Sequence, residues 1–317
     1  MSQQHPPHTL SNIGPMHAPQ IDPSTPKLCI ANKVNIKVCD PQDSFAPSII
    51  HEPPIIYEVQ SYNKSDKRTS AVVLVSGAGG GVSGPAGNIH QPSNPTLPPT
   101  SFETNLHRPT NSQPHAGIYP SLADKIALLL SIPCIRLDYR TPSETTTCTA
   151  DIRAALDHLH AQYGAQKFLV VGWSFGGSPC FSVAAQEPER VLGVVAIASQ
   201  IAGTEAVRAL SPRPLLLLHG EADSVLSPSC SETLFHQYGE KGDRRIRLFP
   251  GDDHGLTGNA ALVERKIFTF AARCLGLEDI VDADVLEQAG TDLVHGKEER
   301  LKEMVRGRDL VNGERLF

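Results

Sequence analysis

The nine residues Leu169-Val170-Val171-Gly172-Trp173-Ser174-Phe175-Gly176-Gly177 decide the fold that this sequence predicts. The apolar run that ends at Val171 has the composition of a buried strand, and the residues after Ser174 have that of a packed helix. Gly-x-Ser-x-Gly therefore lies where a strand turns sharply into a helix, and the two glycines suit a crowded turn because they lack a Cβ. We expect this turn to expose the Ser174 hydroxyl at a helix N-terminus, where developing negative charge is favoured. The alternative is a glycine-rich turn with an incidental serine.

Composition limits the class of protein. The 317 residues suffice for one large or two ordinary domains. Because 28 Lys and Arg are mixed with 34 Asp and Glu, giving a net charge of -6, no basic stripe points to nucleic acid or to an anionic membrane surface. The apolar runs are strand-sized, and residues 1–20 lack the apolar core of a signal peptide. We therefore expect a cytoplasmic protein that acts on a small molecule, without a membrane or nucleic-acid partner.

The cysteines and histidines indicate no metal site. The seven cysteines are odd in number and scattered, with no Cys-x-x-Cys pair, which fits reduced intracellular thiols. The histidines have no ligand spacing, and the glycine-rich segment 76–81 lacks the spacing of a phosphate-binding loop. The sequence thus implies neither a metal nor another cofactor.

The order of the predicted elements indicates a parallel sheet. A polar and apolar alternation predicts a half-exposed strand at 33–38, with 55–59 as its neighbour at an antiparallel edge. From residue 71 onward, unbroken apolar strands alternate with helices, the mark of a mostly parallel sheet covered on both faces. The strands are expected at 71–75, 134–137, 167–171, 192–198, 215–218 and 245–249, and the helices at 121–130, 149–163, 175–187, 229–238 and 259–275.

We expect one core domain at residues 29–276, with a long loop inside it and a separate segment at each end. Residues 1–28 are rich in proline and poor in apolar side chains, so we expect disorder there. The segment 82–118 is a loop of 37 residues with seven prolines, which favours a partial cover over the site, while a solvated insertion without a role stays open. The tail 277–317 predicts two short amphipathic helices that either pack on their own domain or form a homodimer contact.

Two later segments supply partners for Ser174. A serine hydroxyl is a weak nucleophile at neutral pH, so it needs a base within hydrogen-bond reach and a carboxylate to orient that base. Asp223 follows a buried strand in His219-Gly220-Glu221-Ala222-Asp223-Ser224-Val225, and His254 lies in the turn Asp252-Asp253-His254-Gly255 before the last helix. Alone, each would be an ordinary turn residue. Together, each after the end of a parallel strand, they predict a Ser-His-Asp arrangement.

With these motifs, residues 55–275 resemble the α/β-hydrolase superfamily, whose triad follows the chain order Ser, Asp, His. The resemblance implies Ser174 as nucleophile, His254 as general base and then acid, and Asp223 as its orienting carboxylate, with Glu221 a weaker rival. It also implies an oxyanion hole built from the backbone N–H of Phe175 and that of Ala78 or Gly79. Many relatives have His-Gly where this chain has Ser76-Gly77, which leaves the second donor open between the two.

Within the superfamily, the sequence resembles the compact dienelactone-hydrolase-like branch. Only about 15 residues, 200–214, join two strands after the serine, so no helical cap domain fits there. Dienelactone hydrolases carry cysteine where this chain has Ser174, which implies esterase-type chemistry. We expect a serine hydrolase that cleaves a carboxylic ester or thioester through an acyl-enzyme. The alternatives are a non-catalytic hydrolase-fold scaffold or binding protein, and a hydrolase of peptide or C–C bonds.

Overall fold

The computed structural model describes residues 30–38, 44–52, 69–82, 84–85 and 117–290. They form an eight-stranded sheet with the order β1-β2-β4-β3-β5-β6-β7-β8. β1 (Ile30–Lys37) pairs antiparallel with β2 (Phe45–Glu52), which pairs antiparallel with β4. All later pairings are parallel. They join β3 (Ser70–Val75), β4 (Cys134–Leu137), β5 (Lys167–Trp173), β6 (Val191–Ile197), β7 (Leu215–Gly220) and β8 (Arg244–Phe249).

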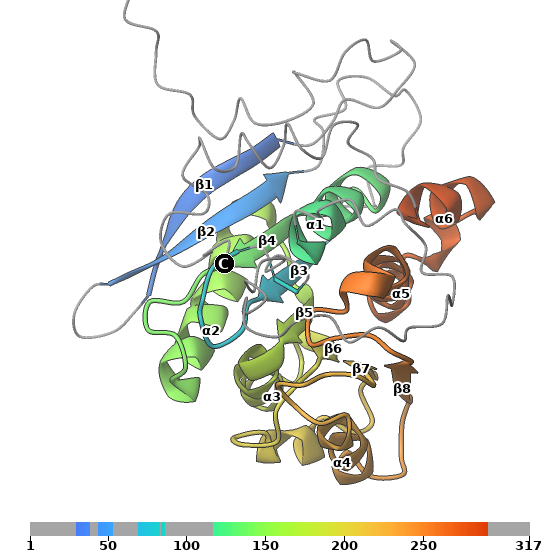
Figure 1. The fold of residues 1–317 in the computed structure, drawn as a ribbon. Helices are drawn as coiled ribbons and strands as arrows, with labels where there is room; N and C mark the ends of the chain where they lie inside the picture. Colours follow the sequence, from blue (N-terminus) through green and yellow to red (C-terminus); the bar gives the residue numbers. More distant parts are fainter. Residues whose placement is uncertain (1–29, 39–43, 53–68, 83, 86–116, 291–317) are drawn as a thin grey trace, which may run out of the picture.

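Helices cover both faces of the sheet (Figure 1). One face carries α1 (Ile118–Leu129), α5 (Ala260–Cys274) and the short α6 (Ala283–Gly290). The other carries α2 (Thr145–Tyr163), α3 (Gly177–Gln186) and α4 (Ser229–Gln237). β3 is buried along its whole length because both of its faces are covered, which explains its unbroken apolar sequence. The expected fold class, a mostly parallel sheet with an antiparallel N-terminal edge, is confirmed.

The predicted elements agree with the structure apart from their ends and one strand. All six parallel strands and all five core helices are present, with α2 starting four residues earlier than expected. The antiparallel partner of β1 is β2, which the sequence analysis did not predict. Pro47 interrupts the usual strand pattern there, yet its carbonyl accepts a hydrogen bond from Asp138 N–H at 3.0 Å. The strand expected at 55–59 lies outside the described residues.

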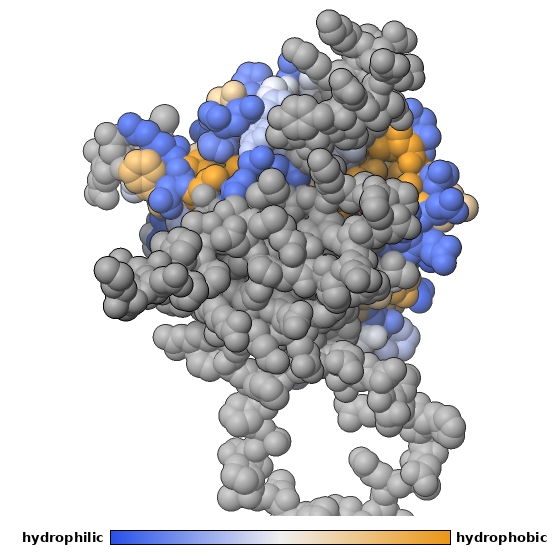
Figure 2. Space-filling view, turned by 90° about the horizontal axis from the view of Figure 1, so that it is seen from above, coloured by the Kyte–Doolittle hydropathy of each residue, from blue (hydrophilic) through white to orange (hydrophobic). Residues whose placement is uncertain are grey.

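Some expectations concern segments that the structure describes only in part. Residues 1–28 lie outside the described ranges, as does most of the loop 82–118. In the tail, a 3-10 turn (Glu278–Ile280) and α6 are described, and α6 packs on α5 through Val285 and Ala289. Among the helices of the described ranges, none has the length and hydropathy needed to cross a bilayer. In the view of Figure 2, blue hydrophilic residues predominate where described atoms are visible, and orange atoms form small separate groups.

Candidate active site

The turn between β5 and α3 presents Ser174 in a strained backbone conformation. Its φ of 55° lies in the left-handed region, which is unfavourable for a residue with a side chain. A Cβ on Gly172 would lie 2.8 Å from Gly177 N, and one on Gly176 would lie 2.5 Å from Ser76 O. Both positions therefore require glycine, because the strand, the turn and the loop after β3 approach too closely for any side chain. The sharp turn expected around Ser174 is thus present.

The structure brings the three predicted side chains into one hydrogen-bonded line. His254 Nε2 lies 3.0 Å from Ser174 Oγ, and His254 Nδ1 lies 2.7 Å from Asp223 Oδ2. The three residues come from the loops after β5, β7 and β8, so the carboxyl edge of the parallel sheet gathers them. With the proton on Nδ1, the imidazole donates to Asp223 and its Nε2 accepts from the serine hydroxyl.

Asp223 is held as an ionised hydrogen-bond acceptor. Its side chain is fully buried, and its Oδ1 accepts from Val225 N–H at 2.8 Å and from Leu226 N–H at 2.9 Å. Burial by itself would raise the pKa of Asp223, but the hydrogen bonds from Leu226, His254 and Val225 outweigh it and place the pKa below its usual value. The rival Glu221 is exposed and His254 bonds to Asp223, so the geometry favours Asp223 over Glu221.

A second imidazole contacts the same carboxylate oxygen. His219 Nε2 lies 3.1 Å from Asp223 Oδ2 and 3.0 Å from Leu226 O, while its Nδ1 lies 2.7 Å from Ser231 Oγ. Burial lowers the pKa of His219, so the ring is neutral. It then donates from Nε2 and accepts from the Ser231 hydroxyl at Nδ1. The sequence analysis singled out neither His219 nor Ser231 as a site residue, although the four-residue spacing from His219 to Asp223 was available as a signal.

The loop that carries His254 is fastened at two points. Trp173 Nε1 donates to the carbonyl oxygen of His254 at 3.1 Å, and the indole and imidazole centroids are 5.5 Å apart. The buried Asp252 accepts from Gly258 N–H at 2.9 Å and from the side-chain amide of Asn259 at 2.8 Å. These bonds tie the loop to the residue before Ser174 and to the start of α5. Both contacts join residues that a strand-and-helix pattern does not relate.

The loop after β3 lies against the serine turn. A Cβ on Gly77 would lie 3.4 Å from the Ser174 Cβ, and a turn closed by Gly80 N–H to Gly77 O at 3.1 Å exposes Ala78 and Gly79. Among the described residues, the amides of Ala78 and Gly79 donate to no protein acceptor. The two candidate donors therefore lie on a loop beside Ser174, with their N–H groups available.

Side chains from β4 and the residues after it hold this loop in place. Asp138 Oδ1 accepts from Gly81 N–H at 2.7 Å, the Tyr139 hydroxyl donates to Ser76 O at 3.2 Å, and Arg136 Nη1 donates to Val82 O at 2.9 Å. Burial raises the pKa of Asp138 above its usual value. These bonds fix both ends of a glycine-rich segment that would otherwise be free to move.

The described cysteines are buried or partly buried thiols. Cys134, Cys148 and Cys180 are buried in the two apolar layers, and burial raises the pKa of each. Thiols with a raised pKa are poor nucleophiles and poor metal ligands. Within the described ranges, no group of His, Cys, Asp and Glu side chains is arranged to hold a metal ion.

Comparisons with known proteins concern the fold. A family model described as the alpha/beta hydrolase fold matches residues 132–229. A lid-less α/β serine hydrolase from Xanthomonas campestris is 15% identical, with a TM-score of 0.52 over 80% of this chain and 97% of that one. A dienelactone hydrolase from Anabaena variabilis is 16% identical, with a TM-score of 0.51 over 77% and 98% of the two chains.

A third similar structure is the esterase domain of a Rhodothermus marinus protein. It is 17% identical, with a TM-score of 0.51 over 77% of this chain and 98% of that one. No curated protein matches the sequence significantly. At these identities the likeness concerns the fold, and at that level the resemblance expected from the sequence motifs is confirmed.

Proposed function

Because this chain has the α/β-hydrolase fold, we propose that it is a serine hydrolase that cleaves a carboxylic ester or thioester of a small molecule. The observation that carries the proposal is the hydrogen-bonded line from Ser174 Oγ through His254 to Asp223, with distances of 3.0 and 2.7 Å. A scaffold that binds without reacting needs no such line. It also needs no strained serine backbone, which costs about 1–3 kcal/mol.

The proposed reaction proceeds in two steps. Ser174 Oγ bonds to the substrate carbonyl carbon while its proton passes to His254 Nε2, and the carbonyl electrons move onto the oxygen. The tetrahedral intermediate then expels the alcohol or thiol, which takes the proton from His254 and leaves an acyl-enzyme. Water activated by His254 attacks the acyl carbon, and Ser174 leaves with the returned proton.

The oxyanion of both intermediates is bound by backbone N–H groups. The amide of Phe175 is the first donor of the proposal, and that of Ala78 or Gly79 is the second. The loop position beside Ser174 and the available amides of Ala78 and Gly79 support the second donor. Each such donor contributes on the order of 10²–10³ to kcat.

Exposed apolar side chains on the same sheet edge support a substrate with an apolar part. Ile201, after β6, is 38% exposed, and Val225, after β7, is 65% exposed. Both follow strands whose carboxyl ends lie at the edge that carries Ser174. An apolar acyl or alcohol group would cover these side chains and gain about 25 cal/mol per Å² of buried apolar area.

A fluorophosphonate probe tests the proposal, since it reacts with an activated serine. We expect labelling of the wild-type chain and none of the Ser174→Ala variant. Ser182→Ala is the matched control, because Ser182 lies on α3 and donates only to Ser178 O, at 3.1 Å. Equal labelling of the Ser174→Ala variant would contradict the mechanism. A panel of p-nitrophenyl esters and acyl thioesters then separates the two substrate types.

The remaining expectations belong to the same proposal. We propose a cytoplasmic enzyme that binds no nucleic acid. The tail 277–317 is the segment through which we propose a homodimer contact. Size-exclusion chromatography compares the oligomeric state of the full chain with that of a chain ending at residue 276. Cell fractionation tests the location.

A further inference from the structure

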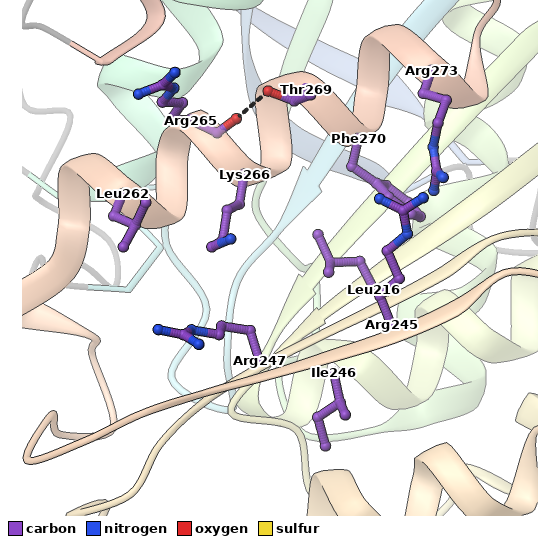
Figure 3. A pocket seen from close by; sticks show the side chains of 10 residues that line it. All are labelled: Leu216, Arg245, Ile246, Arg247, Leu262, Arg265, Lys266, Thr269, Phe270 and Arg273. Carbon is purple, nitrogen blue, oxygen red and sulfur yellow. Dashed lines mark hydrogen bonds between the residues drawn. The ribbon is translucent and has the colours of Figure 1, made fainter.

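A cavity of about 450 Å³ lies between the edge strand β8 and helix α5, and the candidate catalytic residues are not among its lining (Figure 3). Leu216 and Phe270 contribute apolar surface, and both are almost fully buried. The charged part of the lining comes from both elements. It consists of Arg245, Arg247, Arg265, Lys266 and Arg273. A volume of this size is in the range of small-molecule pockets.

The lining contains five cations and no carboxylate. The chain as a whole carries a net charge of -6, so this cavity is a local reversal of the overall charge. Like charges gathered in a concave site repel one another, and a concave surface focuses their field more than a flat one does. A bound anion would relieve that repulsion.

One carboxylate beside the cavity holds two of the guanidinium groups. Asp243 accepts from Arg245 Nε at 3.0 Å and forms an ion pair with Arg273 through its other oxygen. Since Asp243 is shared between two arginines, it neutralises only one of the two charges. Its main effect is to orient both guanidinium groups before any ligand arrives.

The other cations have no such partner. The side chains of Arg247 and Lys266 form no ion pair with any residue of the described ranges, and Arg247 lies 5.8 Å from the Phe249 ring centroid. Within the same ranges, Arg273 Nη2 is buried without a hydrogen-bond partner. An anion in the cavity would supply charged acceptors for Arg247 and Lys266, whose side chains are exposed and partly exposed.

Charges on an edge strand also have a simpler use, because they prevent edge-to-edge aggregation. That use requires charges directed to solvent along the strand. Here Arg245 extends from β8 toward Phe270 and Arg273 of α5, and Lys266 of α5 points toward the strand (Figure 3). Lys266 and Arg273 of α5 thus reach toward the strand that carries Arg245 and Arg247, whereas Arg265 points away from it (Figure 3). Four cations from two elements therefore lie together, which protection of an edge does not require.

We propose that this cavity binds a small organic anion that carries a phosphate group with at least two negative charges. Guanidinium groups bind phosphate through paired N–H donors, and phosphate offers three acceptor oxygens to several cations at once. A monocarboxylate carries only one negative charge, so it would balance only one of these cations. Leu262 also lines the cavity and is 40% exposed, so it offers apolar surface for the organic part.

Isothermal titration calorimetry with inorganic pyrophosphate, at constant ionic strength, tests the site. We expect saturable binding to the full chain, and we expect Arg247→Gln combined with Lys266→Gln to weaken it at least about tenfold. The control removes the same charge elsewhere, by Lys167→Gln with Arg208→Gln on exposed positions of β5 and the segment after β6. That control should bind pyrophosphate as the wild type does.

The outcomes separate this site from the proposed hydrolase site. Ser174→Ala should bind pyrophosphate normally, so loss of esterase activity leaves the inference intact. Absence of saturable binding to the wild type, or equal weakening in the control pair, would overturn it and leave edge protection as the role of these charges. If the double variant fails to unfold cooperatively, Lys266→Gln alone, with the same titration, replaces it.

Discussion

At the scale of single residues, Asp223 is the hydrogen-bond acceptor that several groups of the candidate site share. It accepts two backbone N–H groups at Oδ1 and the rings of His254 and His219 at Oδ2. Four donors fix the carboxylate in position and in charge state. The second ring, His219, is itself fixed by Ser231 and by Leu226 O, so the orientation of His254 depends on a chain of buried contacts.

Replacement of His219 by alanine should lower kcat for an ester substrate by about tenfold, the equivalent of about 1.4 kcal/mol. The loss follows because Asp223 would lose one donor at Oδ2 and hold His254 less firmly. KM should stay near the wild-type value, since His219 is fully buried. His219→Gln, which keeps an N–H donor, should recover part of the rate. Steady-state kinetics at several pH values provide the measurement, and an unchanged kcat in His219→Ala would contradict this positioning role.

At the scale of elements, the turn between β5 and α3 depends on backbone packing. We expect Gly172→Ala to destabilise the fold by about 1–3 kcal/mol and to reduce fluorophosphonate labelling, because the new Cβ would lie 2.8 Å from Gly177 N. Gly164→Ala is the control at the C-terminus of α2. That glycine has a φ of 71° but no atom within 4 Å of an added Cβ, so it should lose about 1 kcal/mol without a change in labelling. Urea unfolding measures both, and similar labelling of the two variants would refute the steric argument.

The elements that the sequence predicted are those whose pattern is local. Buried strands such as β5 and β7 are continuous apolar runs, and the order of strands and helices places Ser174, Asp223 and His254 after strand ends. A parallel sheet then gathers them, so residue order alone indicated the grouping. β2 was missed because Pro47 disrupts its pattern, and its position depends on pairing with β4, which lies far along the chain.

The missed site contacts have the same origin. The bond from Trp173 to the His254 carbonyl spans 81 residues, and the anchoring of Gly81 by Asp138 spans 57. Such contacts depend on side-chain rotamers and on loop geometry, which periodicity and motif spacing do not encode. The sequence shows His219 four residues before Asp223, but it does not indicate which partners the two ring nitrogens bond to.

At the scale of the whole molecule, the sheet separates two regions of different chemistry. The carboxyl edge of β5, β7 and β8 carries the candidate triad, while the cationic cavity lies over the side of β8 that faces α5. α5 is connected to both, because Asn259, the residue directly before it, bonds to Asp252 of the His254 loop, and residues of α5 itself line the cavity. The position of α5 therefore matters to both proposed sites.

A buried ion pair helps to set that position. Lys125 Nζ of α1 lies 2.5 Å from Glu264 Oε2 of α5, with side-chain exposures of only 2% and 8%, and the Ser121 hydroxyl donates to the same oxygen at 2.8 Å. Replacing Lys125 removes this positive charge from beside the buried Glu264 carboxylate. Lys125→Met should therefore cost about 3–5 kcal/mol of unfolding free energy.

Replacement of both partners distinguishes the charge from the packing. The double variant Lys125→Met with Glu264→Leu should regain most of the lost stability, since two apolar side chains of similar volume leave no buried charge. Urea unfolding of the wild type, both single variants and the double variant completes the cycle. Strictly additive losses would mean that the two helices are held by their apolar contacts alone. A recovery in the double variant, with fluorophosphonate labelling retained, would show that the pair governs the stability of the α1–α5 layer and not the chemistry at Ser174.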